Sequence, residues 1–306
     1  MADRGELAAL ADRYLDALVA RDPGRLPLAK SFRYTEDGQA LEPGDGLWGT
    51  ASARGGYLNL FLDPDSGQAA VFATLRENGA PAILVARLKA EAGQISELEC
   101  FVVRLSGGLG PMSRGAEMLD AMGSPSPLWS QPIPPEERLS REALVAAADK
   151  YFWGLEGNDG KKDYSFFAED CERLENGQKT TNNPALRYGE GISERAGAAQ
   201  DFVASLAGMT PRQQFETGYF RFVDRIRDRR FPVVDVERGA VFAFAFFDHS
   251  GTVRDIPLSD GRVLESGVRE PFTWEIGEAF KIEHGRLKFI EAVMKRCPYG
   301  MKAGWG

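Results

Sequence analysis

The chain has 306 residues, 43% of them hydrophobic, and a formal net charge of −8 at pH 7 with a sequence pI near 5.1. This length favours two hydrophobic cores over one, and an acidic chain repels nucleic acid and anionic membranes, so neither is an expected partner. Charges interrupt residues 1–22, so no signal peptide is predicted, and no segment approaches the roughly 18 apolar residues of a membrane span.

In chain order, the first half begins with an amphipathic helix over residues 7–19, where apolar residues recur at helical spacing. Strands are predicted at 69–75, 81–92 and 95–104, and a glycine turn joins the last two as a hairpin. Residues 106–140 are rich in Gly, Pro and Ser, which indicates a connector.

The second half follows the same order of elements. Ser140 is the predicted N-cap of an amphipathic helix over residues 144–155. Strands are predicted at 240–247, 271–283 and 287–296, and a glycine turn again joins the last two. Each half is therefore expected to be one unit in which a helix precedes several strands.

The two halves repeat one sequence pattern. Residues 88–104 align with 280–296 without a gap, and Lys, Glu, Gly, Glu and Arg recur at the same offsets. Insertions near 186–217 and 252–269 lengthen the second copy. We expect an N-terminal domain, a Gly/Pro-rich linker and a C-terminal domain with insertions, at residues 1–105, 106–140 and 141–306.

A helix followed by a long, strongly curved sheet resembles the NTF2-like superfamily, which includes ketosteroid isomerase, scytalone dehydratase and SnoaL-type cyclases. The resemblance is carried by the helices around Tyr14 and Tyr151, the turns at Glu36 and Glu175, and the closing hairpins. It implies an α+β fold of two tandem cone domains, each with N-terminal helices packed on a curved antiparallel sheet. It also implies an apolar cavity under each concave face, although fold alone decides nothing about activity.

Strand alternation places one carboxylate among apolar side chains. Glu291 shares a predicted strand face with Leu287 and Phe289, and Glu99 takes the equivalent place in the first copy. Burial raises the pKa of a carboxyl group and suits it to general acid or base catalysis. In the alternative, a β-bulge turns both glutamates to solvent, or a neighbour such as Lys295 pairs with them.

Three further side chains are candidates for catalysis. His249 ends a strand and is a predicted proton shuttle, or else part of a polar turn. Tyr151, on the apolar face of its helix, is expected either to bind a substrate oxygen or to pack with a structural hydrogen bond. Arg173 and Glu175 share a strand face, where they would stabilise an oxyanion at a pocket mouth or form an ordinary surface ion pair.

The predicted substrate-binding residues are Glu175, Trp274, Phe289 and Lys295. Aromatic side chains suit an aromatic or polycyclic ligand, but aromatic residues at every second position are more often core. His284, in a hairpin turn, is expected to be exposed. Neither the histidines nor the three cysteines have metal-ligand spacing, so no metal and no cofactor are predicted, and the sparse cysteines indicate reduced thiols in a cytoplasmic protein.

The leading hypothesis is a cofactor-independent lyase or isomerase acting on a small hydrophobic, aromatic or polycyclic hydroxylated compound. The reaction is proton abstraction with elimination or a double-bond shift, with Glu291 as acid/base, His249 as shuttle, and Tyr151 and Arg173 stabilising oxygen. The alternative is a non-catalytic small-molecule-binding or scaffold protein, because neither the isomerase pattern nor the paired histidines of the dehydratase are clear. The two domains are expected to pair within the chain, and a homo-oligomer is left open.

Overall fold

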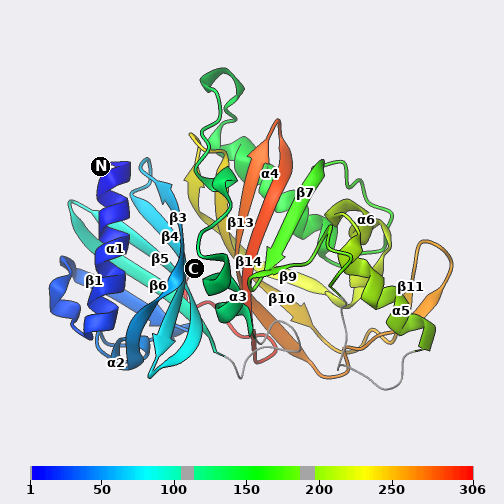
Figure 1. Cartoon of the computed structure of the whole chain (residues 1–306), viewed down its shortest axis with the longest axis horizontal. Coiled ribbons are helices and arrows are strands. Elements are labelled where there is room, and N and C mark those ends of the chain that lie inside the picture. Colours follow the sequence, from blue (N-terminus) through cyan, green and yellow to red (C-terminus); the bar gives the residue numbers. More distant parts are fainter. Residues whose placement is uncertain (1, 105–113, 187–196, 306) are drawn as a thin grey trace.

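Two six-stranded sheets, each with its own helices, make up most of the molecule (Figure 1). The computed structural model describes residues 2–104, 114–186 and 197–305. Figure 1 shows the first unit, in blue and cyan, beside the second unit, in green to red. None of the helices in these three ranges combines the length and apolar character that crossing a bilayer requires.

The first unit begins with a helix and continues as a meander of long strands, in the spatial order β2-β1-β6-β5-β4-β3. Its elements are α1 (Arg4–Ala20), η1 (Pro23–Arg25), β1 (Leu28–Glu36), β2 (Gln39–Ala40), α2 (Leu47–Thr50), β3 (Ala51–Asp63), β4 (Gln68–Glu77), β5 (Ala80–Glu91) and β6 (Gln94–Arg104).

The described part of the connector, from residue 114 on, includes one short helix and two 3-10 turns, and the second unit repeats the topology of the first as β8-β7-β14-β13-β10-β9. The connector elements are α3 (Gly115–Met122), η4 (Pro127–Trp129) and η5 (Pro135–Glu137). The second unit contains α4 (Arg141–Leu155), β7 (Phe167–Glu175), β8 (Gln178–Lys179), α5 (Gly197–Ser205), η6 (Leu206–Gly208), α6 (Pro211–Glu216), η7 (Tyr219–Phe222), β9 (Arg225–Asp235), β10 (Ala240–His249), β11 (Asp255–Pro257), β12 (Val263–Glu265), β13 (Phe272–Glu283) and β14 (Arg286–Cys297).

The predicted α+β class is confirmed, and two mixed sheets with helices fit tandem NTF2-like domains. The expected antiparallel pairing holds for the other strand pairs of each sheet, whereas β1 is parallel to β6 and β7 is parallel to β14. A parallel pair needs a long crossover, and four further strands of each sheet separate its two parallel members along the chain. The domain boundaries at residues 105 and 140 stay a prediction.

The two opening helices begin where local side chains cap them. Asp3 and Glu6 form a capping box at α1, in which each side chain accepts a hydrogen bond from the other residue's backbone N–H. Ser140 accepts from the N–H of Ala143 at the start of α4, so the predicted N-cap is confirmed.

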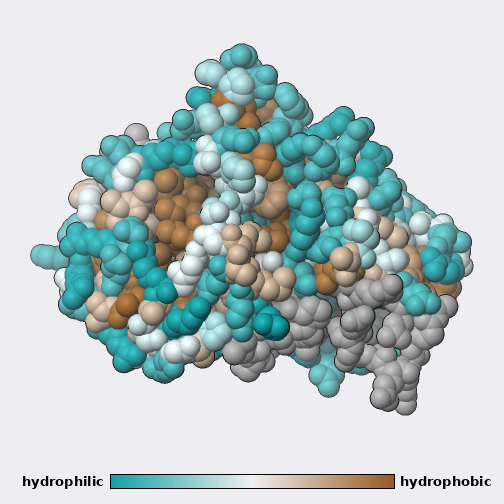
Figure 2. All heavy atoms as spheres, viewed as in Figure 1, coloured by the Kyte–Doolittle hydropathy of each residue, from teal (hydrophilic) through white to brown (hydrophobic). Residues whose placement is uncertain are grey.

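Both faces of each sheet are buried, because alternate strand residues enter different cores. Leu84 and Ala86 of β5 pack beneath α1, whereas Ile83 and Val85 face the other unit. We call the cluster between the two sheets the seam; its aromatic members are Tyr57, Phe61, Phe72, Phe101, Trp129, Phe242, Phe244 and Phe289. In Figure 2, hydrophobic residues are visible on both sides of the segment that joins the units.

Equivalent residues of the two copies meet each other in the seam. Phe72 and Phe242, from segments that share the sequence AVFA, have ring centroids 5.5 Å apart, although strand pairing makes Phe244 the counterpart of Phe72. Val85 and Gly277 are matched by the repeat, and a Cβ atom on Gly277 would lie 2.6 Å from Cγ1 of Val85. Self-contacts of this kind mark the axis of a two-fold arrangement.

Reciprocal ion pairs extend the same two-fold pattern to the ends of the seam. Arg4, the first residue of α1, binds Asp235 of the second unit with Nη1 to Oδ2 at 2.6 Å. Arg141, the first residue of α4, binds Asp63 of the first unit at 2.8 Å. The first and second units therefore pair in the manner of a symmetric dimer, as the repeat leads one to expect.

Candidate functional site

Three of the predicted site residues meet beneath the helices of the second unit. Tyr151 of α4 and Arg173 of β7 are 2% and 3% exposed. Nη1 of Arg173 donates to the Tyr151 hydroxyl at 3.4 Å, and its Nε lies 3.4 Å from Oε2 of Glu175. Glu175 follows Arg173 by two residues on β7, so both side chains point to the same face.

A second group of contacts fixes the position of the Arg173 guanidinium. Its Nη2 donates to Oε1 of Gln214 at 2.7 Å, and its Nε donates to the hydroxyl of Thr180 at 3.2 Å. Gln214 belongs to α6, and its amide in turn donates to the carbonyl oxygens of Thr180 and Leu206. Arg173 and Glu175 do form an ion pair, as one alternative predicted. The pair is not at the surface, however, because these contacts hold Arg173 inside the unit.

Glu278 is a further carboxylate beside this group that was not predicted from the sequence. Glu278 lies on β13, is 2% exposed, and its Oε2 has no hydrogen-bond partner among the described residues. Burial raises its pKa well above 4.5 and the nearby charge of Glu175 adds to this, while Arg173 and a hydrogen bond with Tyr151 act in the opposite direction. Burial therefore favours the neutral, protonated form of this carboxyl group more than solvent does.

The signal that identifies Glu278 was present in the sequence. Trp274, Ile276, Glu278 and Phe280 alternate along β13, so an acidic residue stands in an otherwise apolar row. This is the same pattern that pointed to Glu291 on the next strand.

Aromatic rings enclose the hydroxyl-bearing side chain of this site. Phe152, Phe167, Phe215 and Phe280 lie with ring centroids 5.3 to 6.1 Å from that of Tyr151. Burial and the charge of Glu278 together raise the pKa of Tyr151 well above 10. The phenol is therefore a neutral donor and acceptor that packs tightly and also contacts the polar group.

The first unit has a related polar group, but it has no counterpart of Glu278. Tyr34 donates to Oε2 of Glu36 at 2.9 Å, and the N–H of Leu47 donates to the same oxygen at 2.6 Å. Ala86 takes the place that Glu278 has in the second unit. The two units therefore differ in the acidic residues beneath their helices.

The structure places Glu291 on the opposite face of the second sheet, in the seam. It is 1% exposed and accepts from Tyr57 Oη at 2.7 Å, Asn59 Nδ2 at 2.8 Å and Trp129 Nε1 at 3.0 Å. Burial raises its pKa to about 7, and these hydrogen bonds limit the rise. Glu291 is buried, as predicted. It does not lie in the cavity expected beneath the helices, because it is on the other face of the sheet.

A register irregularity explains part of this error. Leu287 packs beneath α4, whereas Phe289 and Val293 lie in the seam, because the pairing of β14 with β7 shifts between Leu287 and Phe289. Leu287 and Glu291 therefore do not share a face as predicted.

Phe289 and Lys295, predicted to bind substrate, are also interface residues. The ring of Phe289 lies 5.6 Å from that of Trp129 in the connector. Lys295 Nζ bonds Oδ1 of Asp37, in the first unit, at 2.5 Å. Glu99 has the predicted alternative role of an ion-paired residue, since it contacts Arg87 at 3.3 Å and Arg230 at 2.9 Å.

His249 occupies a third place, at the end of β10. It is 1% exposed and stacks on Phe272 with ring centroids 4.2 Å apart, and its Nδ1 lies 3.0 Å from the carbonyl oxygen of Phe247. Burial lowers its pKa to about 4, so the ring is neutral at pH 7. Trp274, a predicted substrate-binding residue, is half-buried and contacts Phe272. His284 is exposed, as predicted.

The four predicted catalytic residues therefore do not form one constellation. Tyr151 and Arg173 lie beneath α4, Glu291 lies in the seam, and His249 lies at a strand end. Within the three described ranges, no cluster of three His, Cys, Asp or Glu side chains is suited to hold a metal ion.

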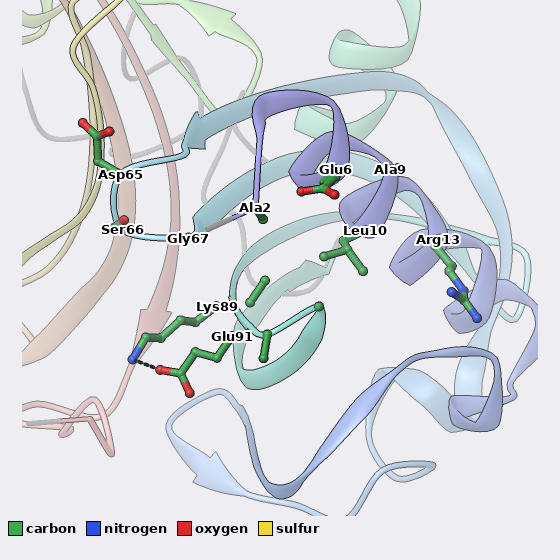
Figure 3. A pocket seen from close by; sticks show the side chains of 13 residues that line it. Ala2, Glu6, Ala9, Leu10, Arg13, Asp65, Ser66, Gly67, Lys89 and Glu91 are labelled. Carbon is green, nitrogen blue, oxygen red and sulfur yellow. Dashed lines mark ion pairs between the residues drawn. The ribbon is translucent and has the colours of Figure 1, made fainter.

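An open groove of about 780 Å³ lies elsewhere, on the first unit (Figure 3). It runs between α1 and the turns that follow β3 and β5, with Leu10 among its lining residues and the 2.7 Å ion pair of Lys89 and Glu91 at one side. None of the predicted catalytic or substrate-binding residues lines this groove. We therefore take the group around Glu278 as the candidate site.

The comparisons with known proteins identify a family for the second unit. The model described as "Domain of unknown function (DUF8021)" matches residues 137–294, about half of the chain, and the chain belongs to this family. No curated protein matches the sequence.

Two solved structures resemble about one third of the chain. An NTF2-like protein of unknown function from Cytophaga hutchinsonii is 13% identical, with 32% of this chain and 88% of that chain covered and a TM-score of 0.25. A ketosteroid isomerase candidate from Kribbella flavida is 19% identical, with 35% and 82% covered and a TM-score of 0.26. Likeness at this level bears on no individual residue and no activity.

Proposed function

We propose that the second unit is a cofactor-independent lyase or isomerase that acts on a small hydrophobic, aromatic or polycyclic hydroxylated compound. The observation that carries the proposal is Glu278, a buried carboxyl group with one unpartnered oxygen beside Tyr151 and Arg173. Glu278 takes the acid/base role first assigned to Glu291, because Glu291 lies on the other face of the sheet.

The proposed chemistry uses the raised pKa of Glu278. Its ionised form removes a proton from a carbon next to an oxygen-bearing carbon, and the resulting carboxylic acid returns that proton to another carbon or to a leaving hydroxide. Arg173 and Tyr151 donate hydrogen bonds to the oxygen on which negative charge develops. Glu175 stays beside Arg173 as its ion-pair partner.

The test replaces Glu278 by Gln, which keeps the shape of the side chain and removes its proton transfer. The full chain is incubated in deuterated water with a panel of enolisable polycyclic ketones and hydroxylated aromatic compounds, and deuterium incorporation is measured by mass spectrometry. We expect E278Q to lower the exchange rate by at least about 10²-fold, the usual contribution of one acid/base group. E270Q, at an exposed glutamate, is the matched control.

A second function, a non-catalytic small-molecule-binding or scaffold protein, is favoured by one specific observation. The rings around Tyr151 fill its surroundings, as expected of a packed core. In that case no member of the panel exchanges its protons. Native mass spectrometry then detects a bound compound if the protein binds small molecules, and no bound compound if it is a scaffold. Equal exchange rates for E278Q and E270Q would likewise remove Glu278 from the mechanism.

A further inference from the structure

Glu291 is an ionisable group enclosed between parts of the chain that come from both units. Tyr57 and Asn59 of β3 belong to the first unit, and Trp129 belongs to the connector. The three contacts lie 162 to 234 residues from Glu291 along the chain. The carboxyl group is therefore the polar centre of an otherwise largely apolar contact.

The partners of Glu291 are all neutral donors. Tyr57 is the titratable group among them, and burial together with the charge of Glu291 raises the pKa of its phenol far above the usual value. On the sheet itself, Glu291 pairs with Leu174 of β7 and Ala279 of β13, which carry no charge. Among the described residues, no ion pair reaches Glu291.

Both protonation states of Glu291 can keep the three hydrogen bonds. The carboxylate accepts from all three donors, whereas the neutral acid accepts from Asn59 and Trp129 and donates its own proton to the Tyr57 oxygen. The two states differ in the cost of holding a negative charge in a dry interface without a cation. This cost falls when the seam opens and water reaches the carboxylate.

We propose that the seam is a pH-sensitive joint, in which ionisation of Glu291 weakens the packing of the first unit and the connector on the second sheet. The proposal concerns the sheet face opposite the candidate site, so it does not depend on the proposed function. Opening means local separation at Tyr57, Asn59 and Trp129, with each unit keeping its own helix-covered core.

The sign of the effect follows from the direction of the pKa change. The closed seam holds the pKa of Glu291 near 7, whereas an exposed glutamate has a value near 4.5. Stability of the closed state is fully present below pH 4.5 and is lost as pH rises to about 7, above which the effect is constant. Over that range we expect the opening equilibrium to increase on the order of 10²-fold.

A second buried carboxyl group at the interface titrates over an overlapping range that extends to higher pH. Glu275 is faced by Lys295, Asp37, Glu99 and Arg230, and burial raises its pKa to about 8. It therefore adds a component that continues to a higher pH than that of Glu291. The variant E275Q removes this component and leaves the contacts of Glu291 in place.

Hydrogen exchange of the full chain, measured by mass spectrometry from pH 5 to 8.5 and corrected for intrinsic exchange rates, tests the proposal. We expect protection of peptides from β3 and residues 123–140 to fall between pH 5 and 7, while α1 and α4 stay protected. E291Q mimics the neutral acid, because its amide donates to Tyr57 and its oxygen accepts the other two bonds. In the E275Q background it should abolish that fall, and a profile that E291Q leaves unchanged in this background overturns the proposal.

Tyr57→Phe provides an independent test if E291Q folds poorly. The Tyr57 hydroxyl favours the ionised form of Glu291, so its removal raises the carboxyl pKa and moves the loss of protection to higher pH. A midpoint that stays in place or moves to lower pH contradicts the proposal. Protection that is independent of pH in the wild type contradicts it as well.

Discussion

Three buried glutamates show that partners, and not burial alone, decide the chemistry of a residue. Glu99 contacts two arginines, Glu291 accepts from neutral donors, and Glu278 lies beside both an acid and an arginine. Strand alternation predicted that Glu291 would be buried, because local sequence determines which residues share a face. It could not predict Tyr57 as a partner, since that contact spans 234 residues.

His249 gives a prediction about pH at the residue scale. Its folded-state pKa of about 4 lies below the unfolded value of 6.5, so its contribution to stability is complete above pH 6.5 and is lost as pH falls towards 4. The full loss is about 3 kcal/mol by linkage, an upper value for this buried ring. We expect the His249 imidazole signals in NMR spectra to stay those of the neutral ring down to about pH 5.

Assignment of those signals is simple because the chain has two histidines. The variant H284N removes the exposed one and leaves the His249 signals alone. A titration midpoint near 6.5 for the remaining ring would show that His249 is hydrated, and would return it to consideration as a proton shuttle.

At the scale of elements, the sequence predicted the two opening helices, the closing hairpins and the repeat, but it did not predict which sheet face meets which neighbour. Both faces of β14 are apolar: Ile290 and Ala292 pack beneath α4, while Phe289 and Val293 enter the seam. Apolar alternation identifies two faces but cannot distinguish a helix from a second sheet as the covering layer. The shift between Leu287 and Phe289 then reverses the phase within the strand.

The short helix α6 gives a prediction at this scale. Its Gln214 is fully buried and joins Arg173 to two backbone carbonyl groups. Q214A removes all three hydrogen bonds inside the unit, so we expect the free energy of unfolding to fall by about 2 to 4 kcal/mol. Urea denaturation of the full chain measures this change, and the same variant should lower any deuterium exchange activity that depends on Arg173.

The control for this prediction is Q94A, at an exposed glutamine in a hairpin. Surface substitutions of this kind usually change stability by less than about 0.5 kcal/mol. Equal effects of Q214A and Q94A would mean that Gln214 does not hold the arginine in place.

At the scale of the whole molecule, the repeat in the sequence becomes a two-fold arrangement in space. The matched arginines Arg4 and Arg141 each reach an aspartate of the other unit, and Val85 meets its own equivalent, Gly277. The aligned repeats predict that two similar units pair, but the contacts at the axis depend on individual side chains. Gly277 is the clearest case, since its counterpart is Val85.

Gly277 therefore gives a prediction about the whole molecule. A methyl group at this position would lie 2.6 Å from Val85 Cγ1 and 3.3 Å from the rings of Phe72 and Phe242. G277A overpacks the axis and should lower the free energy of unfolding by about 1 to 3 kcal/mol, as measured by urea denaturation. The cause is steric and lies across the interface.

A double-mutant cycle separates this cause from a general effect of glycine substitution. V85A removes the side-chain atom that the new methyl group meets, so V85A/G277A places alanine at both matched positions. We expect the double variant to be more stable than the sum of the single changes predicts, by about 0.5 to 3 kcal/mol. Purely additive effects would show that the two residues do not meet in solution, and that the two sheets pair in another register.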